Sequence, residues 1–567
     1  MSHMMQILGE WGKRGVAFLL LFVGVLIQRW DLDFDAWFIL NGGRYVMEHG
    51  IPHEEPFTMH EGLHFVLEQW LTGVLFWNVY DSFGPMGLLQ MVFVICCVLI
   101  YAYYRLCLLV SNGNRQVATL MAMVVGIVAA PFFFVTRPQV ISTLLFVSEV
   151  FLLEQYARRN QWRWLLPLPL LSLLLVNLHA ALWPMLLILL LPFFASWGVG
   201  KLDVLPREYH GKFPVLPFAL AALGIFGAGF CNPYGWEAMS FVFYSYDPEI
   251  HGRIGEIHPA TIQGFFGKFF FGWILLLTII QGRHAMPLHY ILLTFGTALM
   301  GLCAQRNAFL FFFLGTFPLA YAAREWKSVL LSGRQGMGSP LRLLPFVILC
   351  LLLGHRALVE GTMAGLPPIV LFLFIILALC LVCYVFCYTE EGRRFSFKVP
   401  MLRLKCGAIL LSLSAFLGFI IYYPNLHGED FGAQYEPTVD FLLEKQAASD
   451  IVLWTGFNTG AYPEFRGIRC YVDARPEIFL PSNSHQEHNI IKEYYDLVDG
   501  KIYYRDFFHQ YHFTHVLTVE ADGVVHAMLP YDDGFRLIYE QKDEAGNVLC
   551  RLFEIVREED GAAGKKF

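Results

Sequence analysis

The sequence predicts a mainly α-helical, polytopic membrane protein that carries a soluble α/β domain at its C-terminal end. Hydrophobic residues make up 56% of the chain and aromatic residues 16%, while only 15% are charged, and the surface of a soluble globule cannot accommodate this composition. Apolar runs long enough to cross a bilayer recur up to about residue 423, after which the pattern changes to short β-like runs. The net charge of -7 gives no basic stripe of the kind that binds nucleic acid, so no nucleic-acid partner is expected.

The first apolar segment, about 15–28, follows Lys13 and Arg14 and has no small-x-small cleavage site before Arg29. It is therefore expected to be an uncleaved anchor with a cytoplasmic start. Further apolar runs, some of which can cross only as broken or tilted helices, lie near 85–110, 116–134, 139–157, 164–177, 181–197, 214–230, 267–281, 287–303, 306–323, 343–358, 368–388 and 406–423. Together they predict about thirteen crossings.

Lysine and arginine are concentrated in alternate loops, which the positive-inside rule assigns to the cytoplasm. These loops include 158–163, 201–212, 324–342 and 393–405. The first outer loop, 29–68, and the tail then lie together on the outer face, which predicts a transmembrane domain at 1–423 and an extracytoplasmic domain at 424–567. The segment 65–82 is interpreted as an interfacial helix, because a crossing there would place Arg158 and Arg159 outside.

The C-terminal domain is expected to be α/β. Short β-like runs begin at 451, 469, 514, 535 and 547, and they alternate with helical stretches near 436–447 and 484–511. Asp473 and Arg475 follow the second of these strands, where α/β domains often place a ligand, and they either bind a sugar or phosphate or form an exposed structural pair. Cys470 and Cys550 are the cysteines of this domain and allow one disulfide.

Acidic residues follow the first apolar segment at Asp31, Asp33 and Asp35. Carboxylates just outside a membrane span are poorly placed for a core and well placed to meet a substrate at the lipid surface. The predicted topology brings six further polar residues to the same face, at outward helix ends: Arg137, Asn177, His179, Asn232, Glu256 and Arg306. Each alone is compatible with an anchor at the headgroups, but together they favour a polar cavity.

Several motifs resemble one family when taken as a set. The string DFDAWFILNGGRY at 33–45, continued by HGIPHEEPFT and EQWL, resembles the first outer loop of bacterial GT-C membrane glycosyltransferases. These are the polyprenyl-phosphate-sugar-dependent proteins related to family 39 and to the RgtA/B/C/D-like group. TRPQ, NLHA, NPYG, the segment around Glu256, QRN and FNTGAY with YVDAR also resemble these proteins in order, so that the resemblance covers nearly the whole chain.

The resemblance implies transfer of a hexose or pentose, with inversion, from a polyprenyl-phosphate donor to a lipid, glycan or protein acceptor on the outer face of the cytoplasmic membrane. Asp35 is then the general base, with Asp33 or Glu55 as the second acid. Arg137 and Arg306 are the candidates for binding the donor phosphate, because guanidinium groups make charge-assisted contacts to its oxygens. The substrate cavity is expected to be lined by His179, Asn177, Asn232, Glu256, Trp37 and Gln69.

Three aromatic residues near the site, Trp37, Trp70 and Tyr45, either stack on sugar rings or sit in the interfacial aromatic belt, and the belt is favoured. Asp33, Asp35 and Glu55 offer hard oxygen ligands that suit a divalent cation, although no metal site is predicted and no other cofactor is expected.

Two other classes of function remain as alternatives. His60, Glu61 and His64 match the zinc-protease pattern H-E-x-x-H. On a helix His60, His64 and Glu68 would project from one face as zinc ligands, with Glu61 as the general base. Gly62 within the motif and Pro56 before it disfavour such a helix. A non-enzymatic transporter or scaffold is the third class, although no internal repeat is visible and a large outer domain is unusual for a carrier.

Overall fold

The computed structural model describes residues 21–325 and 435–556, apart from gaps at 27, 29, 31, 204, 246, 248–251, 262–264, 284–285 and 544–545. The first predicted span, 15–28, is described as a helix over 21–26. Asp31, the predicted spans near 343–358, 368–388 and 406–423, and the predicted domain boundary at 424 lie outside the described residues.

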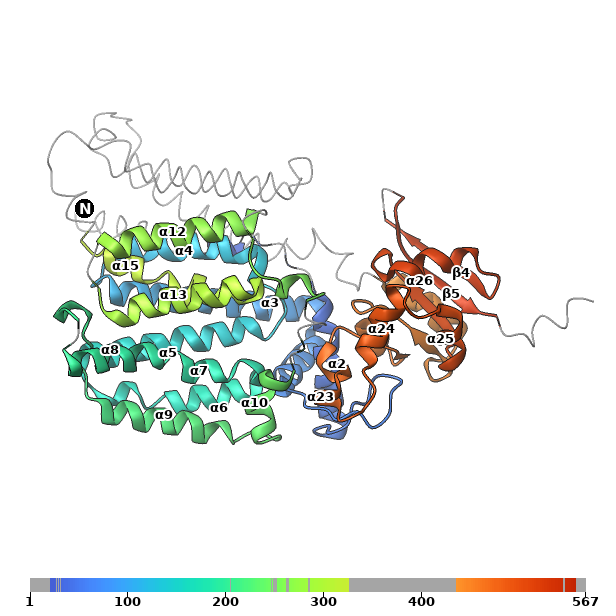
Figure 1. Cartoon of the computed structure of the whole chain (residues 1–567), viewed down its shortest axis with the longest axis horizontal. Coiled ribbons are helices and arrows are strands. Elements are labelled where there is room, and N and C mark those ends of the chain that lie inside the picture. The colour runs from blue at the N-terminus through green and yellow to red at the C-terminus, as the bar shows by residue number, and fades with distance from the viewer. Residues whose placement is uncertain are drawn as a thin grey trace, which may run out of the picture.

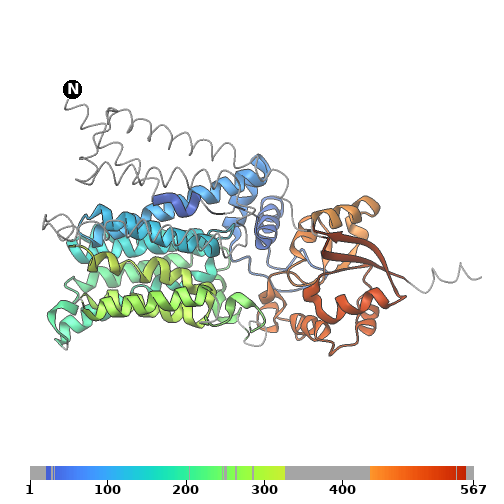
Figure 2. The ribbon, with the colours of Figure 1, turned by 90° about the horizontal axis from the view of Figure 1, so that it is seen from above.

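A bundle of apolar helices forms one end of the molecule, and a smaller α/β region, 435–556, forms the other (Figures 1 and 2). Every predicted span between 85 and 323 contains a helix or a series of short helices. The bundle consists of α3 (Trp70–Val110), α4 (Arg115–Phe133), α5 (Gln139–Arg159), α6 (Leu168–Leu178), α7 (Pro184–Ile188), α8 (Leu191–Leu202), α9 (Val215–Gly229), α10 (Trp236–Tyr244), α12 (Phe265–Arg283), α13 (Leu288–Cys303), α14 (Ala308–Leu310), the π-helical η6 (Phe311–Gly315) and α15 (Pro318–Ala322).

Three helical segments in the described residues are long and apolar enough to cross a membrane. They are Trp70–Val110 with 41 residues, Gln139–Arg159 with 21 and Ala180–Leu202 with 23. Shorter apolar helices accompany them at Arg115–Ala130, Trp162–Leu178, Val215–Gly229, Phe270–Gly282 and Leu288–Cys303. The protein is therefore an integral membrane protein, as predicted, whereas the number of crossings stays a prediction.

The segment predicted to be interfacial, 65–82, supplies the first part of α3. This helix bends at Gly84, whose φ of 67° and ψ of -171° interrupt the helical backbone just before Pro85. The part before the bend crosses α2 (Phe34–His49) in direct backbone contact. A Cβ on Gly43 of α2 would lie 1.9 Å from the carbonyl oxygen of Gly73, so this crossing requires glycine.

The C-terminal α/β region contains all five predicted strands in one sheet of order β2-β1-β3-β5-β4. The strands are β1 (Val452–Trp454), β2 (Arg469–Cys470), β3 (His515–Thr518), β4 (Phe535–Lys542) and β5 (Val548–Ile555). The first three pair in parallel, and β5 runs antiparallel to both β3 and β4. Cys470 and Cys550 are buried free thiols, so the disulfide that the sequence allowed is not formed.

Short helices cover this sheet and connect its strands. They are α21 (Glu436–Lys445), α22 (Ala461–Phe465), η8 (Pro476–Phe479), α23 (Pro481–Ser484), α24 (Ile490–Val498), α25 (Tyr504–Gln510) and α26 (Gly523–Met528). The single helical stretch predicted at 484–511 is divided into α24 and α25, because Gly500 adopts a φ of 76° after the first of them.

Helix α2 lies at the end of the bundle that faces the C-terminal region (Figure 1). Its Trp37 is buried against the rings of Tyr462 and Phe465, at centroid distances of 4.8 and 5.1 Å. Arg44 Nη2 donates to the carbonyl oxygen of Phe465 at 2.7 Å. The two parts of the molecule therefore meet across α2, and the site lies at this junction.

Candidate functional site

Asp33 fixes the start of α2. Its carboxylate Oδ1 accepts a hydrogen bond from the backbone N–H of Asp35 at 3.2 Å and thereby caps the helix. Its own backbone N–H donates to Thr136 Oγ1 at 3.0 Å, which joins the acidic motif to the TRPQ segment between α4 and α5. The capping contact places Asp35 in the first helical turn beside Arg137.

Arg137 gathers three carboxylates, two from the acidic motif and one from the segment around Glu256. Its Nε lies 2.8 Å from Asp33 Oδ2 and 3.1 Å from Asp35 Oδ2, and its Nη2 donates to Asp33 Oδ1 at 3.0 Å. Its Nη1 donates to Glu256 Oε2 at 3.4 Å, and Glu256 belongs to η4 (Gly255–Ile257) between α10 and α12. Both oxygens of Asp33 are occupied, so Asp33 orients Arg137 rather than offering a free base.

Asp35 keeps one free carboxylate oxygen. Its Oδ1 makes no hydrogen bond or ion pair with the part of the chain that the structure describes, and its side chain is 23% exposed. Burial raises the pKa of Asp35 to about 7; Arg137 opposes this, and the carboxylates of Asp33, Glu256 and Glu477 add to it. A partly accessible carboxylate with a pKa near neutrality has the properties of a general base.

A second group of polar side chains consists of Glu68, His179 and Ser142. Glu68 Oε2 accepts a hydrogen bond from the backbone N–H of Ala181 at 3.1 Å, and Glu68 Oε1 lies 3.8 Å from His179 Nε2. His179 Nδ1 is hydrogen-bonded to Ser142 Oγ, in the first turns of α5, at 2.7 Å. Burial raises the pKa of Glu68 to about 8 and lowers that of His179 to about 3.

Arg306 is the cation of this second group. Its backbone carbonyl accepts a hydrogen bond from Gln139 Nε2 at 3.2 Å, which fixes η5 (Gln305–Asn307) to the start of α5. Its guanidinium is exposed and makes no ion pair with the described residues. It nevertheless lies close enough to Glu68 and His179 to lower the pKa of each. Arg137 already contacts three carboxylates, whereas the guanidinium of Arg306 has none among the described residues, so the two arginines differ in what they can bind.

Glu477 comes from the C-terminal region and interacts electrostatically with Asp35, Glu68 and Arg306, and these four groups are called the chamber below. Burial raises its pKa to about 7, while Arg475 and Arg306 lower it and Asp473 raises it. Glu477 in turn raises the pKa values of Asp35 and Glu68, so it stands among the groups of both centres. The sequence analysis missed Glu477, which lies two residues beyond YVDAR, and it considered Glu68 of the EQWL motif only as a zinc ligand of the protease alternative.

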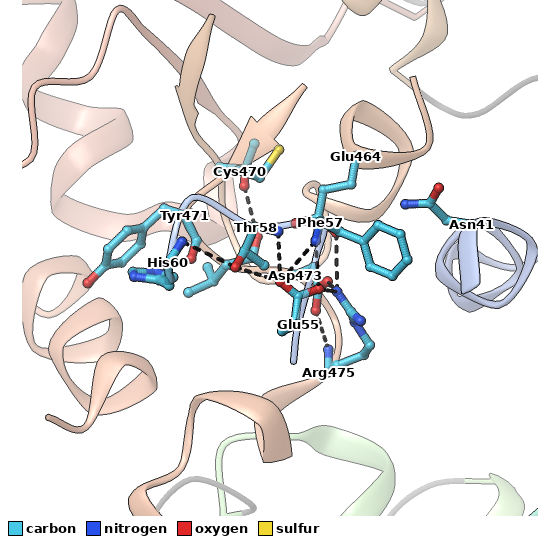
Figure 3. Close-up of polar contacts among 12 residues, drawn as sticks. Asn41, Glu55, Phe57, Thr58, His60, Glu464, Cys470, Tyr471, Asp473 and Arg475 are labelled. Atoms are coloured by element: carbon cyan, nitrogen blue, oxygen red, sulfur yellow. Dashed lines mark hydrogen bonds and ion pairs between the residues drawn. The ribbon is translucent and has the colours of Figure 1, made fainter. Parts of the chain in front are cut away.

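A sealed ionic cluster surrounds Arg475 (Figure 3). Arg475 Nη2 lies 3.0 Å from Glu55 Oε1 and 3.4 Å from Glu464 Oε2, and Arg475 is also paired to Asp473. The four side chains are 0–4% exposed. Burial, followed by the neighbouring Asp473, raises the pKa of Glu464 well above its usual value. Three phenyl rings surround the guanidinium, those of Phe38, Phe57 and Phe65.

This cluster contains three of the site residues proposed from the sequence, namely Glu55, Asp473 and Arg475. Glu55 Oε2 accepts hydrogen bonds from Thr58 N and Thr58 Oγ1, both at 2.8 Å, so Glu55 is occupied within the cluster and is not a partner of Asp33 and Asp35. Asp473 and Arg475 contact each other and are buried rather than exposed, and a ligand at this pair stays a prediction.

No metal site is visible either. Asp33, Asp35 and Glu55 do not converge, and the described ranges contain no group of three or more His, Cys, Asp or Glu side chains arranged to hold a metal ion.

Four other residues expected in the cavity serve the framework. Asn177 binds three groups, with Oδ1 accepting from Trp70 Nε1 at 3.1 Å and Nδ2 donating to the carbonyls of Leu173 and Cys231. Asn232 closes its own turn through the carbonyls of Gly229 and Gly235.

Gln69 is buried as the residue before α3, and Trp37 is buried at the junction described above. Tyr45 stacks on His49 at 4.7 Å.

The H-E-x-x-H segment is a loop, so the geometry that a zinc protease requires is not present. His60 Nε2 donates to the carbonyl oxygen of Tyr471 at 2.8 Å, as Figure 3 shows. His64 instead stacks on His485 at 4.3 Å and lies 3.5 Å from Glu237. Gly62 between them has a φ of 68°, which is incompatible with a helix.

Comparisons with known proteins bear on the fold alone. No protein-family model and no curated protein matches this sequence. The crystal structure of the Archaeoglobus fulgidus oligosaccharyltransferase in the apo form aligns with 97% of this chain and 75% of its own, at 11% identity and a TM-score of 0.54. The archaeal oligosaccharyltransferase AglB from the same organism, in complex with an inhibitory peptide and a dolichol-phosphate, aligns with 96% and 74%, at 11% identity and a TM-score of 0.53.

ArnT from Cupriavidus metallidurans bound to undecaprenyl phosphate aligns with 96% of this chain and 97% of its own, at 10% identity and a TM-score of 0.48. The two alignments with the archaeal enzyme cover nearly the whole chain. The chain therefore has the fold of the Archaeoglobus fulgidus oligosaccharyltransferase.

Proposed function

We propose that this protein is an integral membrane glycosyltransferase that moves a sugar from a polyprenyl-phosphate donor to an acceptor hydroxyl at the outer face of the cytoplasmic membrane. The observation that supports this most directly is that Asp35 keeps a free oxygen and Arg306 a free guanidinium, and that Glu477 interacts electrostatically with both. AglB, whose fold the chain shares, has been captured with a dolichol-phosphate, and this favours a lipid phosphate as the donor group.

In the proposed reaction Asp35 Oδ1 accepts the proton of the acceptor hydroxyl. The acceptor oxygen attacks the anomeric carbon while the bond from this carbon to the phosphate oxygen breaks, so a single displacement inverts the configuration. Arg137 does not contact the phosphate in this scheme, because its donors already serve Asp33, Asp35 and Glu256. It orients the base.

Arg306 binds the phosphate, since a guanidinium makes charge-assisted hydrogen bonds to anionic oxygens. The start of α5 supports the same placement. Gln139 and Ser142 in its first turns hold Arg306 and His179, and the positive end of a helix favours an anion nearby.

The proposal also includes the orientation of the chain in the membrane and a role for the C-terminal region. The N-terminus is cytoplasmic, and the transmembrane part, proposed as 1–423, opens its chamber toward the extracytoplasmic domain proposed as 424–567. The sealed cluster around Arg475 holds this domain against the first outer loop, and Glu477 is its contribution to the chamber.

The test is sugar transfer by purified protein in lipid vesicles, supplied with a panel of polyprenyl-phosphate-linked hexoses and pentoses and with extracted membrane acceptors. Wild-type protein is expected to release polyprenyl phosphate and form a covalent product. Asp35→Asn is expected to lower the rate about 10²–10⁴-fold, the usual contribution of a general base. Glu48→Gln, an exposed carboxylate on the same helix, is the matched control and is expected to keep the wild-type rate.

Two outcomes would contradict the proposal. A well-folded Asp35→Asn variant with wild-type transfer would remove Asp35 from the mechanism. Accumulation of the lipid-linked sugar inside sealed vesicles, without any covalent product, would instead indicate the transporter that the sequence left as an alternative.

A further inference from the structure

Glu68 is a chamber carboxyl that the proposed displacement does not use. It is 13% exposed and makes no ion pair with a lysine or arginine of the described residues. Its Oε2 is held by the backbone N–H of Ala181, and its Oε1 lies 3.8 Å from His179 Nε2, beyond hydrogen-bond distance. One oxygen of the carboxyl is therefore anchored and the other is free.

The groups that face Glu68 determine its protonation. They are His179 at the end of α6, Arg306 on η5 and Glu477 on η8. Burial and the nearby Glu477 raise the pKa of Glu68, while the N–H groups of Ala181 and Ala180 and the charge of Arg306 lower it less, and the result is about 8. His179 is neutral, because burial lowers its pKa to about 3. At pH 7 Glu68 is thus a neutral acid.

The position of the proton follows from these contacts. Because Oε2 accepts the N–H of Ala181, the acidic O–H belongs on Oε1, the oxygen on the side of His179. An ionised carboxylate near Arg306 would repel a phosphate, whereas a neutral acid donates a hydrogen bond to it. An anion can therefore accept a hydrogen bond from Glu68 Oε1 while Oε2 keeps its hydrogen bond from Ala181.

We propose, on the basis of the glycosyl transfer above, that Glu68 is the hydrogen-bond donor to the lipid phosphate. When the bond between the anomeric carbon and the phosphate oxygen breaks, its electron pair stays on that oxygen. The neutral Glu68 keeps its proton and donates a hydrogen bond from Oε1 to the phosphate, while Asp35 receives the proton of the acceptor hydroxyl. One proton thus passes from the acceptor to Asp35, and solvent restores Asp35 to its starting state.

The experiment measures binding of a C55 polyprenyl monophosphate to the detergent-solubilised full-length protein between pH 6 and 9.5. In wild-type protein the dissociation constant is expected to rise about tenfold from pH 7 to pH 9, because the neutral, binding-competent form of Glu68 becomes a minor fraction. In Glu68→Gln this rise is expected to disappear, since an amide donates N–H at every pH. The amide oxygen still accepts the N–H of Ala181, so the fold is preserved, and an unchanged Tm verifies this.

Controls separate Glu68 from the other titrating groups. The second ionisation of the phosphate, near pH 6, and the titration of Glu477 are common to both proteins, so the ratio of their dissociation constants isolates Glu68. Glu68→Asp keeps an ionisable group and is expected to retain a pH-dependent affinity. Glu48→Gln is expected to follow the wild-type curve.

The outcomes distinguish this inference from the proposed function. If wild-type and Glu68→Gln proteins weaken in parallel above pH 8, or if neither does, Glu68 is not the donor while lipid-phosphate binding stands. If the lipid phosphate does not bind at pH 7, or if it binds equally well to Arg306→Gln, the glycosyltransferase assignment fails together with the inference.

Discussion

Two arginines in this protein each gather three carboxylates, yet their surroundings differ. Arg137 pairs with Asp33, Asp35 and Glu256, whose side chains are 14%, 23% and 44% exposed. Arg475 pairs with Asp473, Glu55 and Glu464, which are at most 1% exposed. The same residue types therefore form an open cluster at the chamber and a sealed cluster around Arg475.

The difference in solvent exposure indicates which of the two ion clusters a substrate can reach. In the sealed cluster aromatic rings exclude water, so no substrate atom can approach, and its value lies in joining the first outer loop to the C-terminal region. In the open cluster one oxygen of Asp35 remains accessible. Removal of one partner from a sealed cluster leaves an unpaired buried charge. The same change in the open cluster costs less free energy, because water solvates the charge that remains. Mutations should therefore separate the two clusters.

The largest expected effect on structure is that of Arg475→Met. It leaves Glu55 and Asp473 buried without their cation, and losses of about 3–5 kcal/mol are usual for such a change. We expect the C-terminal region to become sensitive to limited proteolysis and the Tm to fall. Arg469→Met, an exposed arginine on β2, is the control and should leave both unchanged. Wild-type protease resistance in Arg475→Met would show that the cluster does not hold the two parts together.

Arg306→Gln is expected to have the next largest effect, confined to binding. Loss of a charge-assisted contact to phosphate costs about 1.5–3 kcal/mol, or about 10–100-fold in affinity for a polyprenyl phosphate at pH 7. The Tm should not change, because Arg306 has no ion-pair partner to lose among the described residues. An affinity loss that is larger in Arg137→Gln than in Arg306→Gln would reverse the roles assigned to the two arginines.

The pH dependence of transfer tests the open cluster directly. A general base must be ionised, so kcat/KM should rise about tenfold per pH unit below pH 7 as Asp35 loses its proton, and the inferred role of Glu68 predicts a fall above pH 8. Arg137 lowers the pKa of Asp35, and therefore Arg137→Gln should move the inflection to higher pH. An inflection that stays in place in Arg137→Gln would show that another group titrates.

The smallest expected effect is that of Glu464→Gln in the sealed cluster. Burial and the neighbouring Asp473 raise the pKa of Glu464, which favours its neutral form, and glutamine has the same shape and no charge. The change should cost less than about 1 kcal/mol, or about 3 °C in Tm. Asp473→Asn is the contrasting variant, because Asp473 accepts from both the backbone N–H and Nε of Arg475 and should be far less replaceable. Equal losses in the two variants would mean that both carboxyls are ionised.

Much of the architecture could be predicted because its signals are local. Apolar runs predicted the bundle helices from 85 to 323, and β-like runs predicted the five strands, since both depend on periodicity within one segment. The acidic motif and the outward helix ends also predicted that Asp33, Asp35, Arg137 and Glu256 would meet. Asn177, Asn232 and Trp37 were expected beside them and instead serve the framework, because a polar or aromatic residue at a helix end reveals nothing of its partners.

The sequence by itself determined that this is a membrane protein with an acidic outer motif and a terminal α/β region, because composition and periodicity record how much apolar surface each segment must bury. Only the tertiary structure decided which of the carboxylates are sealed and which are open. Glu55 was separated from Asp35, and Glu68 and Glu477 were brought into the chamber, by contacts across more than a hundred residues of chain. Burial and electrostatic environment, which set the protonation of these groups, arise from such distant contacts and leave no local pattern in the sequence.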